Sequence, residues 1–398
     1  MPEIIAATGP QSARLYFLDW LRILATLAIF SFHNSRFYDF TDWHIKNAQT
    51  SQVAAAYTSF MNIWMMPLFF ALSGAAVYFS LRARSAREFL KERFWRIGVP
   101  WLVTGLFIIA PPQVYLERLT HGEFTGNFFQ FIPHYFDGLY GFGGNFAFHG
   151  MHLWYLMQLS IFSVIALPLL LPGKTNASII TRLGRVLDRP WLLPFLFATL
   201  IIAVVVTSVA GLEFTEQMGS WDIVSYLIFF LLGYMLVSGE RFLASIRKQG
   251  PWLLGAATAL SVLHLYFDYG LKPDWYDGWL RGPAAWAWMV GLLWVGQRFL
   301  NFSNGFTRYV NEMVLPFYVL HQTVILLVGY FVIPWNTGIP LKYLVISSCS
   351  FVIIVFIYEA FIRRVAVLRT LFGMKPRPRP VREAAAEPEE VPLAVPEA

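Results

Sequence analysis

Long apolar stretches alternate with shorter polar ones along the 398 residues of the chain. Most apolar stretches run for about 17–25 residues, the length that a helix needs to cross the core of a bilayer. Helices are expected because lipid cannot hydrogen-bond free backbone groups, and the stretches lack the alternation of barrel strands. We therefore predict an all-α bundle of about ten transmembrane helices, at 17–38, 57–80, 97–115, 151–171, 191–211, 222–239, 251–268, 282–300, 313–334 and 342–362.

Composition supports a polytopic integral membrane protein. Hydrophobic residues make up 57% of the chain and charged residues 14%, and the mean hydropathy is +0.53. Soluble globular proteins have about 45–50% apolar and about 25% charged residues. Only one cysteine is present, which excludes an intramolecular disulfide and makes a cysteine-based metal site or nucleophile implausible.

Basic residues occur in every second polar connection. The basic connections are 81–96, 173–190, 240–249 and the tail after 362, whereas 39–56, 116–150 and 212–222 are acidic or neutral. Because cytoplasmic loops carry the excess of Lys and Arg, this alternation predicts that both termini are cytoplasmic. The location that we expect is the cell inner (plasma) membrane. The alternation also argues against a nucleic-acid partner, despite the net charge of +6.

The polar pattern divides the chain into three parts. Residues 1–14 form a short cytoplasmic segment without a cleavable signal, and 15–365 form the transmembrane domain. Residues 366–398 form a cytoplasmic tail, which we expect to be disordered from about 375 because it is rich in Pro and charge. Connection 116–150 is too long for a simple turn and is expected to help form a site.

Arg22 and His33 are ionisable residues within the first apolar stretch. Eleven helical steps place them on nearly the same face, about 16 Å apart along the axis. The alternative is a purely structural role, in which Arg22 pairs with Asp19 and His33 bonds a neighbouring helix. Ionisable groups inside membrane spans are nevertheless unfavourable enough to mark function by default, so we favour a functional role for both.

Other polar residues lie within the predicted spans. His152, near the start of the fourth, and His321, in the middle of the ninth, are equally consistent with function and with packing. His264 with Asp268 is more typical of packing. No two histidines have a metal-ligand spacing with a carboxylate nearby, so no metal site is predicted.

Two further stretches have both a structural and a functional interpretation. Ser73 and Gly74 interrupt the second span, where small residues favour close helix packing. The basic connection 81–96 is typical of membrane orientation and lipid headgroup contact. Its arginines are alternatively suited to attract an anionic cofactor.

The order of five motifs resembles the integral-membrane acyltransferase type 3 family over nearly all of residues 15–365. These motifs are "RILATLAIFSFH", "PLFFALSG", "RFWRIGVPWL", "HLWYLMQL" and "LPFYVLHQTVI". The beginning of the chain and the "RIGVP" turn are most similar to the branch that succinylates periplasmic glucans. The resemblance implies a bundle of about ten helices, and functional roles for Arg22 and His33.

The resemblance also implies a reaction. An acyl group would pass from cytoplasmic acyl-CoA, the donor substrate, to a hydroxyl of an envelope carbohydrate, without a permanently bound cofactor. An arginine suits the CoA phosphates because it binds them through two hydrogen bonds. Arg22 is the first candidate, with Arg82, Arg93 and Arg96 as further ones. His33 would be the general base that activates the acceptor hydroxyl.

The donor that stabilises the oxyanion is left open. His152, His321 and Tyr318 are candidates, and Trp154 is a further candidate for substrate contact. The predicted function is thus a membrane O-acyltransferase for acetyl or succinyl groups. The alternative is a transporter or flippase for a glycan or glycolipid, although the internal repeats and paired broken helices common in transporters are not apparent.

Overall fold

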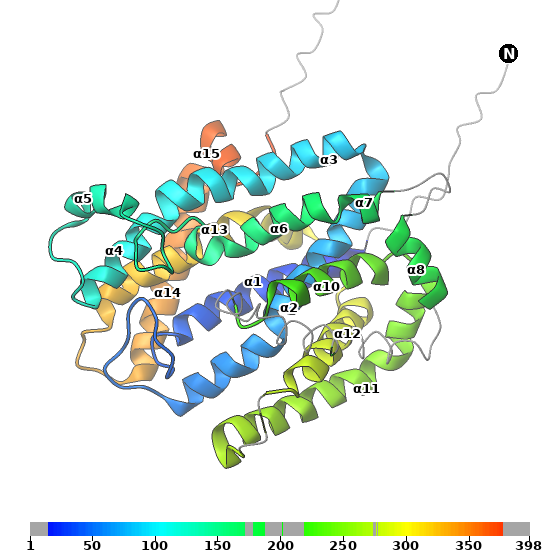
Figure 1. The fold of residues 1–398 in the computed structure, drawn as a ribbon, viewed down its shortest axis with the longest axis horizontal. Coiled ribbons are helices and arrows are strands. Elements are labelled where there is room, and N and C mark those ends of the chain that lie inside the picture. The colour runs from blue at the N-terminus through cyan, green and yellow to red at the C-terminus, as the bar shows by residue number, and fades with distance from the viewer. Residues whose placement is uncertain are drawn as a thin grey trace, which may run out of the picture.

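The computed structural model describes residues 15–171, 178–187, 201, 219–273, 276 and 278–376. The described part is all-helical and contains no strand; Leu139 and Phe146 form an isolated bridge. Long helices pack alongside one another, with the connections 36–51 and 116–150 at one end of the bundle and α3 and α8 toward the other (Figure 1).

The bundle is built from long helices, joined by shorter helical segments. The helices are α1 (Tyr16–Ser35), α2 (Gln52–Ala83), α3 (Ala86–Arg93), α4 (Ala110–Thr120), α5 (Phe128–Phe131), α6 (Trp154–Ile165), α7 (Leu167–Leu170), α8 (Ile179–Leu187), α10 (Ile223–Leu236), α11 (Glu240–Leu265), α12 (Arg281–Phe299), α13 (Gly305–Val332), α14 (Ile339–Ile357) and α15 (Ala366–Leu371).

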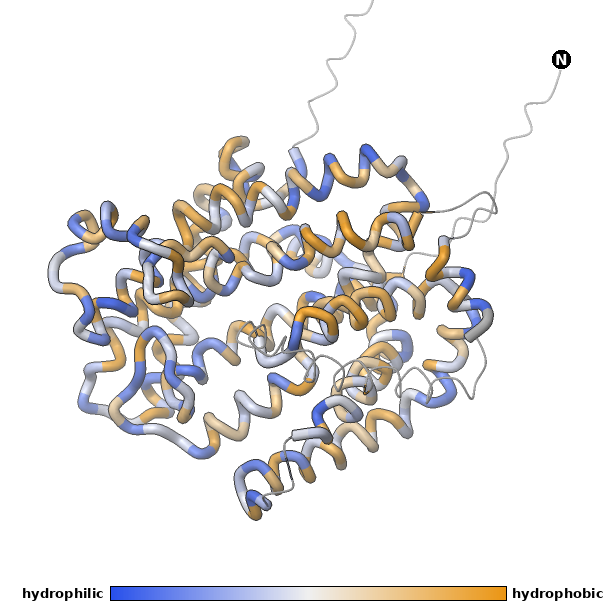
Figure 2. Tube along the Cα trace, in the orientation of Figure 1, coloured by the Kyte–Doolittle hydropathy of each residue, from blue (hydrophilic) through white to orange (hydrophobic). Residues whose placement is uncertain are grey.

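Five helical runs in the described part are long and apolar enough to cross a membrane. They are Gln52–Ala83, Ala86–Thr120, Glu240–Leu271, Gly305–Val332 and Ile339–Ile362. The hydropathy along the chain shows apolar residues throughout the long helices and hydrophilic ones in the connections and around α3 and α8 (Figure 2). A helical membrane protein is therefore confirmed.

The remaining predicted spans have different outcomes. The stretches at 151–171 and 222–239 contain shorter apolar helices, Met151–Ile165 and Ile223–Leu236. The stretch at 191–211 lies almost entirely outside the described residues, as do the N-terminal segment 1–14 and most of the tail. The number of ten spans and the cytoplasmic termini thus stay predictions.

The basic connection 81–96 is helical for most of its length. After Arg84, Ser85 caps α3 through a reciprocal capping box with Glu88, which satisfies free backbone donors at the start of the helix. The helix then widens into π-helical turns at Phe94–Gly98 and Pro100–Ile109 before it becomes α4. One continuous helical run therefore carries the arginines of this connection into the bundle.

Helices α2 and α10 cross at very close range. A Cβ atom at Gly74 would lie 1.8 Å from the carbonyl oxygen of Phe230, and one at Gly233 would lie 1.9 Å from that of Ala71. Only glycine fits at either position, so Gly74 has the packing role that its sequence context favours. Its neighbour Ser73 points elsewhere and hydrogen-bonds the hydroxyl of Tyr155 at 2.5 Å.

Candidate active site

His33 on α1 and His321 on α13 form a hydrogen-bonded pair. Nδ1 of His33 lies 2.8 Å from Nε2 of His321, and the two rings stack with centroids 4.9 Å apart. His321 is fully buried, whereas His33 is partly exposed. The first and ninth predicted spans therefore meet at the two histidines that the sequence singled out.

The hydrogen-bond partners of His33 and His321 show which of their ring nitrogens carry a hydrogen. Nδ1 of His321 bonds the carbonyl oxygen of Tyr318, and a carbonyl can only accept, so this nitrogen carries the hydrogen. Nε2 of His321 is then an acceptor and receives the Nδ1 hydrogen of His33. The lone pair of His33 is consequently on Nε2, which has no hydrogen-bond partner among the described residues. That nitrogen is available to take up a proton.

His152 completes a cluster of three histidines. Its ring centroid lies 4.8 Å from that of His321 and 6.2 Å from that of His33. Two consecutive residues in the left-handed region, Gly150 and Met151, turn the chain sharply just before it. A left-handed conformation at a non-glycine residue such as Met151 is unfavourable, and here it directs His152 into the bundle.

Both ring nitrogens of His152 are occupied. Nε2 donates to the carbonyl oxygens of Tyr318 and Val319, each at 3.2 Å. Nδ1 accepts from the side-chain amide of Gln113 at 3.2 Å. The hydroxyl of Tyr318 donates to the backbone oxygen of His152 at 2.5 Å. In this arrangement the oxyanion candidates His152, His321 and Tyr318 bond one another and support His33.

A buried chain of amides links His152 to the end of the bundle that carries connection 116–150. Gln113 accepts from Gln322 at 2.8 Å, and Gln322 contacts Nε2 of His44 at 3.1 Å. His44 in turn bonds the carboxylate of Glu117. Because a carboxylate only accepts, His44 donates to Glu117 and accepts from Gln322, and the amide nitrogen of Gln322 donates to Gln113 as well.

Within connection 116–150, the segment around residues 140–149 packs against Glu117 and Arg118. The hydroxyl of Tyr140 donates to both carboxylate oxygens at 2.9 Å, and Arg118 donates to the backbone oxygen of Gly144 at 2.9 Å. Burial, together with the Glu117 charge, raises the pKa of Tyr140 well above its ordinary value. Burial lowers the pKa of His149, whose ring lies 5.7 Å from that of Tyr140, to about 4.

Three arginines gather near the start of α1. Arg22 lies close enough to Arg93 and Arg96 for their positive charges to repel one another. Arg22 bonds Asp19 at 3.2 Å and Asn311 at 3.4 Å. Arg96 lies 3.5 Å from Glu92. Within the described part of the chain Arg93 is not ion-paired and lies over the ring of Phe89, so the cluster carries excess positive charge.

Among the described residues, Arg82 and Trp154 form no hydrogen bond or ring contact with the members of these two clusters. Arg82 donates to the hydroxyl of Tyr78 at 2.7 Å. Trp154 packs beside the stacked rings of Phe70 and Tyr226, at 6.3 and 5.4 Å between centroids. The structure thus brings Arg22, Arg93 and Arg96 together without Arg82 or Trp154.

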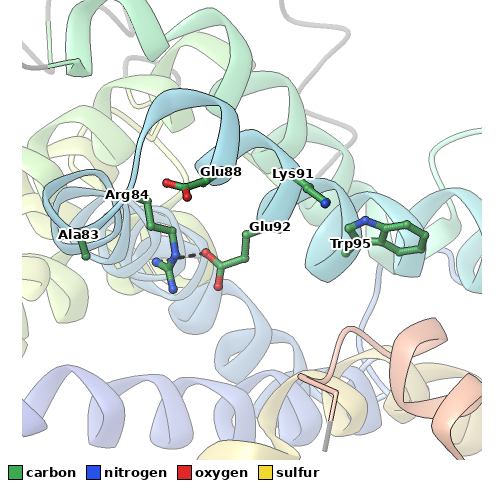
Figure 3. Close-up of a pocket in the computed structure, with 6 residues that line it drawn as sticks. All are labelled: Ala83, Arg84, Glu88, Lys91, Glu92 and Trp95. Carbon is green, nitrogen blue, oxygen red and sulfur yellow. Dashed lines mark ion pairs between the residues drawn. The ribbon is translucent and has the colours of Figure 1, made fainter. Parts of the chain in front are cut away.

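A pocket opens beside the arginine cluster. Its volume is about 410 Å³, and Figure 3 shows its lining residues around the turn from α2 into α3: Ala83, Arg84, Glu88, Lys91, Glu92 and Trp95. Arg84 forms an ion pair with Glu92 at 3.2 Å. Glu92 therefore contacts both the pocket and Arg96.

Two tyrosines connect the arginine cluster with the histidines. Tyr155 lies within electrostatic range of Arg22 and Arg93, and its ring lies 5.8 Å from that of Tyr318. The ring of Tyr318 lies 5.4 Å from that of His321. A continuous series of polar and aromatic side chains thus joins the cations to the histidine cluster.

Sequence reasoning missed several residues of this site. Gln113 and Gln322 are uncharged amides inside apolar stretches, which is the signal that would have marked them. His44 and Glu117 are in or next to polar connections, where a charged residue needs no special explanation. Trp43, which stacks against His33 with planes at 12°, left no distinctive signal.

No three His, Cys, Asp or Glu side chains are arranged to hold a metal ion within the described ranges. A family model described as an acyltransferase domain matches residues 15–359, nearly the whole helical bundle. The chain belongs to this acyltransferase family. The protein is therefore a membrane enzyme that transfers acyl groups, which favours the enzyme over the transporter.

Relatives of this acyltransferase carry a more specific name. It is 25% identical to "Glucans biosynthesis protein C" of Salmonella gallinarum over 91% of this chain and 95% of the relative. It is 24% identical to the protein of the same name from Escherichia coli O139:H28, with the same coverage. The predicted resemblance to the glucan branch is thus confirmed. No solved structure matches the chain significantly.

Proposed function

We propose that the acyltransferase moves an acetyl or succinyl group from cytoplasmic acyl-CoA to a hydroxyl of an envelope glucan or a related carbohydrate. The hydrogen-bonded pair of His33 and His321 carries this proposal, because it leaves a lone pair on Nε2 of His33. An alcohol is a weak nucleophile until its proton is being removed. A histidine oriented by a second group is the arrangement that this step requires.

The reaction follows from the pair. Nε2 of His33 takes the proton of the acceptor hydroxyl while the oxygen attacks the thioester carbonyl. The carbon–sulfur bond then breaks, and the CoA thiolate takes the proton from His33. His321 accepts the Nδ1 hydrogen of His33 throughout, which holds the ring in place and stabilises its charged form.

The donor would approach from the end that carries the arginines. Arg22, Arg93 and Arg96 offer excess positive charge for the phosphates of CoA, and the pocket beside them offers Trp95 and Lys91 to the nucleotide end. In a bundle of ten spans with cytoplasmic termini, this end faces the cytoplasm of a cell whose inner membrane holds the protein. The thioester would then lie near Tyr155 and Tyr318, between the cations and His33.

Product analysis tests this function. Purified protein is incubated with labelled acetyl-CoA or succinyl-CoA and an extract of envelope glycans, and the products are identified by mass spectrometry. Wild-type protein should acylate a carbohydrate. His33→Gln, which keeps hydrogen-bonding capacity but is not a base at neutral pH, should form no product, whereas the matched change at an exposed histidine, His134→Gln, should be active. Product formation by folded His33→Gln would refute the assignment of the base.

A further inference from the structure

Trp43 lies beside the proposed base, although it belongs to the irregular connection between α1 and α2. The centroids of the Trp43 and His33 rings are 6.2 Å apart and their planes are inclined by only 12°. Trp43 takes no part in the hydrogen bonds of the histidine cluster, and its side chain is only partly buried. Its position next to His33 therefore needs another explanation.

Ion pairs join the residues before Trp43 to the residues after it. Asp39 is 1% exposed and forms ion pairs with Arg36 at 2.5 Å and with Lys46 at 2.8 Å. The ammonium group of Lys46 also donates to the backbone oxygens of Arg36 and Asp39, both at 2.7 Å. The guanidinium group of Arg36, which has five N–H donors, and the ammonium group of Lys46 thus close the segment into a turn.

The connection is also fixed to the bundle. The hydroxyl of Thr120 donates to the backbone oxygen of His44 at 2.8 Å, and the His44 ring bonds Glu117. Phe37 is completely buried, and its ring is nearly perpendicular to that of Trp43 with the centroids 4.9 Å apart. A segment without regular secondary structure is thereby attached to the bundle at the residues on either side of the Trp43 ring.

We infer that Trp43 is the surface on which a sugar ring of the acceptor lies while one of its hydroxyls meets His33. A hydroxyl bonded to a ring nitrogen lies roughly 2.8 Å from it, and the Trp43 ring is centred only 6.2 Å from the His33 ring, so the attached pyranose can reach Trp43. The face of an indole is apolar and negative, and it complements the C–H groups of a pyranose face. The inference rests on the acyl transfer proposed above.

The position of Trp43 favours the acceptor over the donor. Connection 36–51 lies at the end of the bundle opposite α3 (Figure 1), whereas the arginines proposed for CoA lie near α3 and the start of α1. A sugar also suits the polar surroundings of Trp43, since the side chain of its neighbour Asp42 is exposed and its carboxylate can accept hydrogen bonds.

Acceptor kinetics test the inference. The acceptors are a soluble glucose oligosaccharide and glycerol, which has hydroxyls but no ring, with succinyl-CoA and acetyl-CoA as donors. Trp43→Ala should raise the KM for the oligosaccharide about tenfold, a change expected for an aromatic contact, and should leave the KM for acyl-CoA and the transfer to glycerol unchanged. Trp43→Phe should have a smaller effect. Phe40→Ala, at an exposed ring in the same connection, is the matched control.

Binding provides a second readout that does not depend on turnover. The affinity for the oligosaccharide is measured by calorimetry in His33→Gln protein, with and without Trp43→Ala. The inference predicts weaker binding with the second change. It is overturned if the oligosaccharide KM and affinity match those of Phe40→Ala, if the KM for acyl-CoA rises instead, or if glycerol transfer falls as much as oligosaccharide transfer.

The two proposals fail in different ways. Absence of acyl transfer by wild-type protein to either acceptor would refute the proposed function. Acyl transfer with an oligosaccharide KM that does not change when Trp43 is replaced would refute only the proposed contact between Trp43 and a sugar ring. If Trp43→Ala does not fold, Trp43→Phe decides, because it keeps an aromatic ring of smaller area: an oligosaccharide KM equal to that of wild type would then overturn the inference.

Discussion

Nδ1 of His33 donates its hydrogen to Nε2 of His321 across 2.8 Å, although the two residues are 288 positions apart in the chain. The second histidine thereby fixes the orientation and the tautomer of the first. A base whose position is fixed by a second group is more effective than a free one, because its lone pair already points in the reactive direction.

Replacement of His321 should reduce turnover without loss of acyl-CoA binding. His321→Phe removes the acceptor for the His33 hydrogen, and we expect kcat to fall by about 10²-fold, the lower end of the contribution of a general base. His321→Gln places an amide oxygen near the lost nitrogen and should retain more activity. The measurement is steady-state kinetics with wild-type protein as reference. Equal activity of the Phe and Gln variants would contradict the orienting role.

Arg22 should be sensitive to a change that keeps its charge. Arg22→Lys loses the planar fork that binds a phosphate through two hydrogen bonds, and we expect acyl-CoA to bind about tenfold more weakly, since hydrogen bonds to charged groups contribute about 1.5–3 kcal/mol. The measurement is calorimetric titration with acetyl-CoA. The control is Arg298→Lys, at an exposed arginine over the ring of Phe299. Unchanged affinity in Arg22→Lys would indicate that Arg22 is structural.

The amide chain behind His152 should contribute to stability. Gln113→Leu leaves the partners of this amide, among them Gln322 and His152, without one of their hydrogen bonds. Each unsatisfied buried polar group costs about 1–3 kcal/mol, so the thermal midpoint in detergent should fall. Gln297→Leu is the matched control, because both polar atoms of Gln297 are buried without a partner among the residues that the structure describes. That variant should be as stable as wild type or more so, and a similar loss in both would contradict the prediction.

Acid should loosen connection 116–150 through His149. Burial lowers the pKa of His149 from the ordinary 6.5 to about 4, so the unfolded chain binds more protons than the folded chain between these values. Stability is therefore lost as the pH falls from 6.5 toward 4. The thermal midpoint should fall less over this range in His149→Gln than in wild type. An identical pH dependence of the two proteins would exclude this contribution.

Single cysteines test the predicted orientation. In a Cys349→Ser background, Ala83→Cys should be protected from an impermeant thiol reagent in intact cells, whereas Thr125→Cys should react. Both sites are exposed in the structure, and neither side chain forms a cap, unlike the neighbouring Ser85. Lysed cells, in which both should react, are the control. Labelling at residue 83 with none at 125 would reverse the topology.

The sequence by itself determined the class of the fold and the first candidate residues. The length of an apolar stretch reports directly whether a helix can cross a bilayer, and the spacing of Arg22 and His33 reports their shared face because helical periodicity is local. The small residue Gly74 likewise indicated close packing, and the structure shows it against the backbone of Phe230.

Only the tertiary structure decided which of these residues meet. Periodicity gives the face of a helix but not its neighbour, because many apolar faces can pack against one another in lipid with similar energy. The selection of His321 as partner of His33, the arginine cluster without Arg82, and the place of Trp43 beside His33 all depend on how distant segments pack. A tryptophan in a polar connection carries no local signal of the ring against which it stacks.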